Sequence, residues 1–249
     1  SLLGSTCVVM LAVGAAIGGV FASVFGRDAA FIANGVSFAL AAILFSRIKT
    51  PMQKDRDVET QRQRIRPIAD MREAINHSRK DPVLMALIFS KTTFAIGAGV
   101  VSQLAVLASD VFNGGDAARG LLIGVRGVGT GLGPLIAMRY TRGQLGKVLL
   151  ICGFASLAFS GFYLVGAWMP TLWLTAIFVM LAHLGGGAQW TLSSYGLQLR
   201  SPDHIRGRIL AGDFALVTLM LSLTSALAGL VSELYGVRQA ISGFACAAA

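Results

Sequence analysis

Long stretches without charged side chains constrain this chain more than any other feature of its sequence. Residues 1–26 contain no Asp, Glu, Lys or Arg, and neither does the stretch of 52 residues from 148 to 199. About 20 consecutive apolar residues are enough for a helix to cross the roughly 30 Å hydrocarbon core of a membrane. The second stretch is therefore long enough for two crossings, with a natural break at Trp168-Met169-Pro170.

The same argument, applied along the chain, predicts seven membrane-spanning helices and the start of an eighth. With 55% hydrophobic and 13% charged residues, the composition argues against a water-soluble globule and supplies apolar residues for about seven spans. The expected fold is all-α, a polytopic transmembrane helix bundle. The predicted spans cover residues 2–25, 29–46, 82–107, 119–138, 148–167, 171–192 and 209–232, and residues 237–249 begin the eighth.

Basic residues gather on one side of this topology. The loop 47–81 holds ten of the 21 Lys and Arg residues, and alternate connection of the spans places 16 on this side and three on the other. Cytoplasmic loops of membrane proteins carry an excess of this kind. We therefore predict a multi-pass protein of the cell (inner) membrane with a cytoplasmic loop 47–81. The net charge of +9 then reflects orientation, and nucleic acid is not an expected partner.

Part of this loop is predicted to be helical. Residues 67–79 place Ile68, Met71 and Ile75 on one face of a short helix. A helix with such a face suits a position on the inner leaflet of the membrane. A solvated linker with some helicity explains the same residues equally well.

Three short strings resemble the major facilitator superfamily of transporters. The first is Gly14-Ala15-Ala16-Ile17-Gly18-Gly19, which is followed by residues 30–34 and has Ala15 where exporters carry proline. The second, residues 198–208, resembles the loop between helices ten and eleven in the siderophore and drug exporter branch, the enterobactin-exporter-like group. The third matches the superfamily's loop motif at Gly133, Leu135, Arg139 and Arg142, with Met138 and Thr141 in place of its Asp and Gly.

This resemblance implies that the chain is a piece of a twelve-helix carrier, covering about helices five to eleven and part of twelve. Residues 1–46 would be the last two helices of the N-terminal half, residues 47–81 the central cytoplasmic loop, and residues 82–249 the C-terminal half with its last helix truncated. In such carriers the substrate cavity lies between the two halves, which rock about it in alternating access. The residues expected in gating or loop contacts are Arg139, Arg142, Asp203, Arg206, Arg208 and Asp213.

Lys91, Arg126 and Asp213 are charged residues that lie inside predicted spans. Each costs about 2.5–3.5 kcal/mol at a helix centre unless it meets water or a partner. Lys91 lies about 13 Å along its helix, too deep to reach the interface easily, so we predict a cavity-facing or ion-paired side chain. Arg126 either lines the cavity or extends outward to the interface. Asp213 is either a pathway residue or an interfacial group near the arginines that precede its span.

Helical spacing adds further candidates for the cavity wall. Ser102 lies eleven residues past Lys91, on nearly the same helix face, and the sixth span carries a polar and aromatic stripe that includes Gly187. Alternatively, the tryptophan of this stripe anchors the helix at the interface, and its histidine is a packing residue. The candidate substrate or cavity residues are Lys91, Ser102, Arg126, His183, Trp190 and Ser194.

Glycines at four-residue spacing crowd the span 119–138. Small residues at this spacing let helix backbones approach closely. The resemblance implies that this span meets the first span across the two halves at a moving interface, although static packing would require the same glycines. The glycines expected at this interface are Gly14, Gly18, Gly124, Gly127 and Gly131.

These observations favour a secondary active transporter. The expected function is ion-gradient-driven efflux of amphipathic small molecules of the drug or siderophore type, with protons as the coupling ion and the lipid bilayer as the surroundings. The alternative is a transport-inactive membrane sensor or interaction protein that uses the basic loop to bind an anionic partner or lipid. The spans lack a paired-carboxylate, Ser/His or His/Cys cluster, so we predict neither an enzyme nor a cofactor or metal site.

Overall fold

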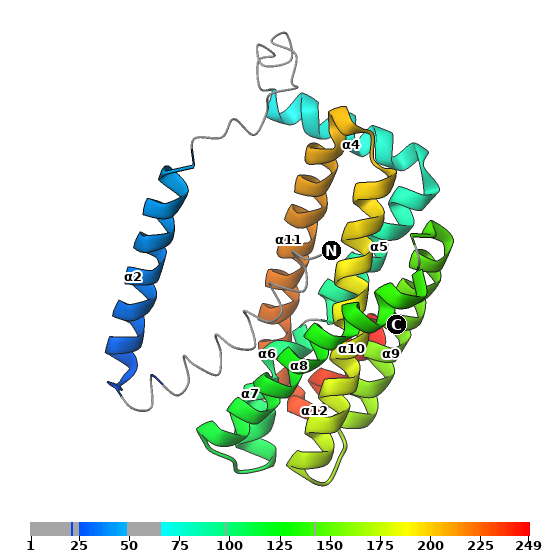
Figure 1. Cartoon of the computed structure of the whole chain (residues 1–249). Coiled ribbons are helices and arrows are strands. Elements are labelled where there is room, and N and C mark those ends of the chain that lie inside the picture. The colour runs from blue at the N-terminus through cyan, green and yellow to red at the C-terminus, as the bar shows by residue number, and fades with distance from the viewer. Residues whose placement is uncertain (1–20, 22–24, 49–65, 98, 142) are drawn as a thin grey trace. The chain divides into compact units, whose positions relative to one another are not determined.

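The computed structural model describes residues 21, 25–48, 66–97, 99–141 and 143–249, and all regular structure within these ranges is helical. Almost all of the predicted first span, with Gly14 and Gly18, lies outside the described residues, as do Arg142 and residues 49–65 of the loop 47–81. The chain divides into two units, one of residues 13–68 and one that includes residues 69–249. The helices are labelled in Figure 1. Six described segments are long and apolar enough to cross a membrane.

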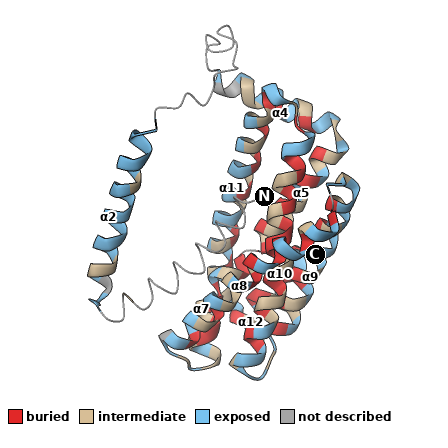
Figure 2. Cartoon of the chain, viewed as in Figure 1, coloured by how far each residue is buried: buried red, intermediate tan, exposed pale blue. Residues whose placement is uncertain are grey.

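Helix α2 (Arg27–Ser46) is the described helix of the first unit, and it agrees with the predicted span 29–46. It begins after Gly26, whose φ of 85° is a conformation that glycine adopts without steric cost. Large apolar side chains such as Phe31 and Phe38 are exposed along it, and most of the helix is coloured as exposed in Figure 2. A surface of this composition suits contact with lipid or protein better than contact with water.

The second unit begins with α4 (Pro67–Lys80) and α5 (Pro82–Gly97), which are separated by a single residue. The Asp81 carboxylate accepts hydrogen bonds from the backbone N–H groups of Val83 at 2.9 Å and Leu84 at 3.4 Å. Asp81 is thus an N-cap, and Pro82 occupies the first helical position, where its missing N–H costs nothing. This short connection places the end of α4 beside the start of α5.

The third predicted span is not one continuous helix. After α5 the chain forms α6 (Gly99–Ser102), α7 (Leu104–Val106) and the π-helical turn η1 (Leu107–Val111). The N–H of Gln103 bonds to the carbonyl of Val100, three residues back, which tightens the turn between α6 and α7. The predicted span 82–107 thus falls within a segment that is long and apolar enough to cross a membrane, Pro82–Val111, and a turn at Gln103 interrupts its helix.

The remaining helices overlap the predicted spans and are mostly longer. They are α8 (Asp116–Thr141), α9 (Leu145–Gly166), α10 (Leu172–Arg200), α11 (Asp203–Tyr235) and α12 (Val237–Ala247). Helix α10 continues past the predicted end at residue 192, and α11 starts before the predicted residue 209. A helix does not end where its side chains become polar, so hydropathy alone underestimates its length.

Helix α10 lies at the centre of this unit, packed against α5, α8 and α9 (Figures 1 and 2). Glycines make the contact with α8 unusually close. A Cβ at Gly129 or Gly133 would overlap the backbone carbonyl of Met180 or Leu184 on α10, whereas a Cβ at Gly124 or Gly127 would meet open space among the described residues. The backbones of α8 and α10 can approach this closely only because glycine has no side chain.

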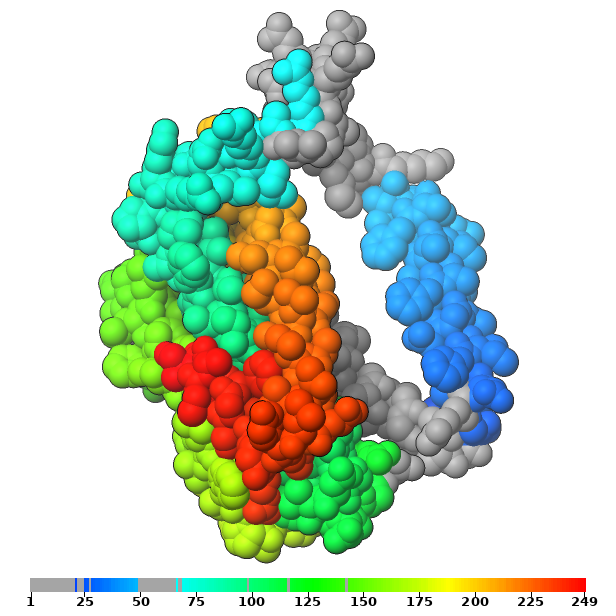
Figure 3. Space-filling model, turned by 180° about the vertical axis from the view of Figure 1, so that it is seen from behind, coloured from blue at the N-terminus to red at the C-terminus, as the bar shows by residue number. Residues whose placement is uncertain are grey.

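Helix α11 presents one narrow face to the bundle. Its buried positions begin with Ile205, Ile209, Asp213 and Val217, at a spacing of four residues, and they form one stripe along the helix. Figure 3 shows α12 lying beside α11 on this side of the unit. The stripe carries a carboxylate into the interior, where it meets α5.

Candidate functional site

Lys91 of α5 and Asp213 of α11 form a buried ion pair. The Lys91 Nζ donates to Asp213 Oδ2 and, at 2.8 Å, to Ser194 Oγ of α10. It also lies 5.4 Å from the centre of the Trp190 ring, within cation–π range. The two charged side chains are only 4% and 2% exposed. The ammonium therefore has partners on two other helices, which offset the loss of its hydration.

The position of Asp213 corrects one alternative drawn from the sequence. Its interpretation as an interfacial group near Arg206 and Arg208 is wrong, because Asp213 is buried and pairs with Lys91. The four-residue spacing from Ile209 turns Asp213 onto the buried stripe of α11. The two arginines pair instead with acidic residues at the start of α11 and on α4, namely Asp203, Asp70 and Glu73.

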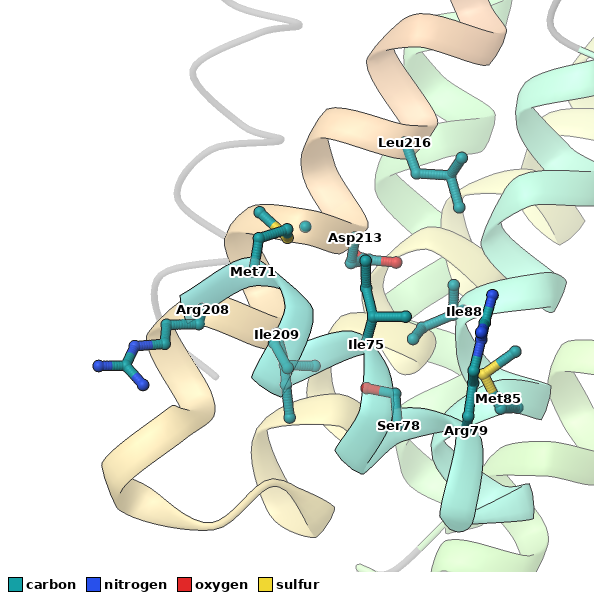
Figure 4. A pocket seen from close by; sticks show the side chains of 12 residues that line it. Met71, Ile75, Ser78, Arg79, Met85, Ile88, Arg208, Ile209, Asp213 and Leu216 are labelled. Atoms are coloured by element: carbon teal, nitrogen blue, oxygen red, sulfur yellow. The ribbon is translucent and has the colours of Figure 1, made fainter. Parts of the chain in front are cut away.

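The Asp213 carboxylate has a second oxygen, Oδ1, and the residue also borders a cavity. Oδ1 is buried and accepts no hydrogen bond among the residues that the structure describes. The cavity, of about 280 Å³, lies between α4, α5 and α11 and has a largely apolar wall (Figure 4). In this view Met71 of α4 lies beside Asp213 and Ile75 lies beneath it, and the Arg208 guanidinium points away from the cavity. The space therefore leads from the α4 end of the unit to the buried carboxylate.

Helix α4 covers this cavity and is held there by charge. Arg208 of α11 contacts Asp70 at 3.3 Å and Glu73 at 2.7 Å. Ala74 and Ser78 of α4 are buried in the unit. The predicted helix at 67–79 is confirmed, although the side chain of Ile68 lies outside the described part. On its apolar face, Met71 is half-buried against the unit and Ile75 is 44% exposed, so the position of this helix on the inner leaflet stays a prediction.

A second charged contact joins the ends of two helices close by. The Asp81 carboxylate accepts a hydrogen bond from Arg200 Nε at 2.6 Å. Partial burial raises the pKa of Asp81, but the hydrogen bond from Arg200 and those from the N–H groups of Val83 and Leu84 lower it more. The pKa of Asp81 therefore lies below its ordinary value of 3.8. Arg200 belongs to the resemblance string 198–208, and its role is to tie the end of α10 to the start of α5.

His183 of α10 belongs to a separate buried network. Its Nε2 is 2.8 Å from the Tyr163 hydroxyl of α9, and its Nδ1 is 3.4 Å from the Thr130 hydroxyl of α8. The histidine is 1% exposed, and its ring makes an edge contact with Phe159. Arg126 of α8 lies close enough to both rings, His183 and Tyr163, to interact electrostatically.

The other predicted site residues are distributed as follows. Trp190 and Ser194 both contact Lys91, so the α10 stripe is divided between the ion pair and the His183 network. Ser102 is exposed beyond the end of α5, and its hydroxyl donates to the Gly99 carbonyl, so it does not share the environment of Lys91. Arg139 is exposed at the end of α8, and Gly131 is buried in that helix.

Sequence reasoning missed several uncharged polar residues. The buried Gln189 of α10 donates through Nε2 to the carbonyl and the hydroxyl of Ser90 and to the Thr93 hydroxyl of α5. These side chains flank the ion pair, and Tyr163 and Thr130 complete the second network. Their signal was present as isolated polar residues inside apolar spans, but a search for formal charges passes over them.

These features define a class of protein. Six helices capable of crossing a membrane and a buried, hydrogen-bonded charge pair between them are typical of a multi-pass membrane protein with a functional polar interior. The described residues contain no cluster of three His, Cys, Asp or Glu side chains that could hold a metal ion.

Comparison with known proteins identifies the family. A model of the transmembrane secretion effector family, within the major facilitator superfamily, matches residues 2–249. The chain therefore belongs to this family of membrane transporters, and its all-α transmembrane fold is the expected one. Searches of curated proteins and of solved structures returned no match.

Proposed function

We propose that this transporter exports amphipathic small molecules by alternating access, that the proton gradient drives it, and that the pair Lys91–Asp213 couples the two processes. The observation that supports the proposal is a buried ion pair whose carboxylate retains one oxygen without a hydrogen bond. Such an oxygen is available to accept a proton. A buried carboxylate inside a membrane-spanning bundle is a candidate functional site, because the burial of a charge there is energetically unfavourable.

Protonation of Asp213 changes the energy of the contact between α5 and α11. When a proton binds the carboxylate, Asp213 becomes neutral, while the ammonium of Lys91 keeps its own protons and loses its counter-charge. Breaking a buried ion pair in this way costs about 3–5 kcal/mol, because one charge remains buried and uncompensated. The cost is relieved if the helices separate and water reaches Lys91. Proton binding therefore favours a conformation in which this part of the bundle is open.

The proton route runs through the cavity under α4. Asp213 lies five residues past Arg208, about 7 Å along α11. The cavity borders Asp213 at one end and α4 at the other. Because its wall is largely apolar, release of the proton requires that α4 moves and admits water. The ion pairs of Arg208 with α4 would then act as a gate at the cytoplasmic side.

The test is transport by the purified protein in liposomes. The cargo is a set of fluorescent compounds with one pyrene ring and three different head groups: 1-pyrenebutyrate, 1-pyrenebutanol and 4-(1-pyrenyl)butyltrimethylammonium. We expect at least one compound to move against its gradient when a proton gradient is imposed, and the movement to stop when a protonophore is added. Asp213→Asn should abolish the uphill movement and retain exchange of the compound across the membrane.

Two outcomes count against the proposal. If Asp213→Asn transports uphill at the rate of the unaltered protein, the carboxylate does not couple proton and substrate. If no compound moves in response to the gradient, the alternative of a transport-inactive sensor gains support. Ser194→Ala is the matched control, because it removes one hydrogen bond from Lys91 and leaves both charges in place.

A further inference from the structure

Arg126 of α8 is a membrane-embedded cation that has no ion-pair partner among the described residues. Its Nε is buried and has no hydrogen-bond partner in that part of the chain. Asp213, the one buried carboxylate of the described interior, is already engaged by Lys91. Residues 1–26 contain no acidic side chain that could serve instead. Among the described residues of this unit, Lys91 and Asp213 thus neutralise each other, and the half-buried Arg126 is left as a cation without a carboxylate partner.

The surroundings of Arg126 leave its guanidinium free to bind an anion. The neighbouring rings of His183 and Tyr163 bond to each other, and the Thr130 hydroxyl donates to the backbone carbonyl of Arg126 at 2.9 Å. The hydrogen-bonding groups beside the guanidinium are thus engaged with one another. A guanidinium carries five N–H donors and binds carboxylates and similar oxyanions through two parallel hydrogen bonds. An anion is the ligand that satisfies both its donors and its charge.

An aromatic row connects this cation to the ion pair. Ring centres of His183 and Phe159 are 5.5 Å apart, those of Phe159 and Phe94 5.1 Å, and those of Phe94 and Trp190 5.9 Å. Trp190 in turn lies against Lys91. Phe159 is buried, whereas Phe94 and Trp190 are only partly buried and present apolar surface. His183 and Trp190 are seven residues apart on α10, so the row extends about 10 Å along this helix.

We propose that Arg126 binds the anionic group of the transported molecule, and that the apolar part of that molecule lies along Phe94 and Trp190. The substrate class is then an amphipathic anion with an aromatic or aliphatic body. This inference rests on the proposed transport function and specifies its substrate.

Binding of the three pyrene compounds to the purified protein tests the inference without a gradient. The chain has three tryptophans, so the variant with Trp168→Phe and Trp173→Phe keeps Trp190 as the donor for energy transfer to a bound pyrene. We expect pyrenebutyrate to bind at least about tenfold more tightly than the alcohol or the trimethylammonium compound, the ratio expected for a charge-assisted hydrogen bond. Arg126→Gln should remove this preference, and Arg126→Lys should retain part of it. Arg119→Gln, the same charge change on the same helix, should leave the preference intact.

The outcomes separate this inference from the proposed function. If the unaltered protein does not prefer the carboxylate, or if Arg126→Gln keeps the full preference, the inference is overturned whether or not transport is observed. If Arg126→Gln loses the preference but no compound crosses the liposome membrane, the anion site stands and the transport proposal fails. Should Arg126→Gln fold poorly, the preference of the unaltered protein and the partial retention in Arg126→Lys decide the question.

Discussion

Lys91 and Asp213 lie 122 positions apart in the sequence, and their side chains form one buried ion pair between α5 and α11. Ser194 and Trp190 of α10 contact the same ammonium, so three helices meet at one charged group. Each charge alone is costly inside a membrane protein, and each makes the other tolerable. The stability of the bundle and its response to protons therefore depend on the same two side chains.

Removing one charge of this pair should destabilise the folded protein more than removing both charges. Lys91→Met and Asp213→Leu should each lower the free energy of unfolding by about 3–5 kcal/mol, because each leaves a buried charge without its partner. The double variant should recover most of this loss, because two apolar side chains then pack together. Thermal unfolding of the detergent-solubilised protein measures the effect. Equal unfolding temperatures for the double variant and the worse single variant would contradict the pair as a stabilising unit.

The glycines of α8 should differ sharply in their tolerance of a side chain. Gly129→Ala should destabilise the protein, because its Cβ would overlap the Met180 carbonyl and force α8 and α10 apart. A Cβ at Gly124 or Gly127 would meet open space among the described residues, so Gly124→Ala and Gly127→Ala should leave the unfolding temperature nearly unchanged. Gly127→Leu adds a larger side chain on the same face. If Gly127→Leu folds normally but reduces transport, the exposed glycine face contacts another part of the protein during the cycle. Unchanged flux in Gly127→Leu would refute such a contact.

The ion pairs of Arg208 should control access to the cavity beside Asp213. Ser78 of α4 lines this cavity and is 5% exposed, so Ser78→Cys in a background without native cysteines should react slowly with a water-soluble maleimide. Adding Arg208→Gln removes both contacts to Asp70 and Glu73 and should accelerate labelling several-fold. Arg206→Gln is the matched control, since it removes a neighbouring positive charge that pairs within α11. Equal labelling rates in all three backgrounds would show that these ion pairs do not hold α4 closed.

The contact between Asp81 and Arg200 should contribute stability that is lost in acid. The pKa of Asp81 lies below 3.8 in the folded protein, so its stabilising effect is fully present above that value and declines as the pH falls through the lowered pKa. Asp81→Asn retains an N-cap side chain but loses the ionic contact. The difference in unfolding temperature between the two proteins should therefore be constant near neutral pH and shrink below about pH 4. A difference that grows on acidification would have the wrong sign for this contact.

The sequence predicted the helices well and their ends poorly. The apolar stretches that indicate spans coincide with α2, α8, α9, α10 and α11, and the N-cap and proline at positions 81 and 82 correctly mark the start of α5. The tight turn at Gln103 was not predicted, because the residues on both sides of it are equally apolar. The far end of α10 was missed for the opposite reason, since Ser193 to Arg200 is helical although its hydropathy falls.

For the candidate site, the sequence identified the charged residues whose burial is energetically unfavourable, but it did not identify the residues that pair with them. Lys91, Arg126 and Asp213 were recognisable because a charge inside an apolar stretch stands out without any structural information. The membership of Asp213 in the stripe with Ile209 and Val217 was visible at a spacing of four, yet its proximity to basic residues in the sequence suggested the wrong partner. Gln189 and Tyr163 carry no charge, so a search for formal charges inside apolar stretches does not find them, although they are isolated polar residues there.

By itself the sequence determined which segments are helices suited to a membrane and which residues have an unfavourable free energy of burial there. Both properties depend on the transfer free energy of residues within a window of about 20 positions, so they are local. Only the tertiary structure decided that Lys91 faces Asp213, that Tyr163 bonds to His183, and that α4 covers the cavity. These contacts depend on how each helix is rotated about its axis and on which helices pack together, and side chains more than a hundred residues apart set that packing.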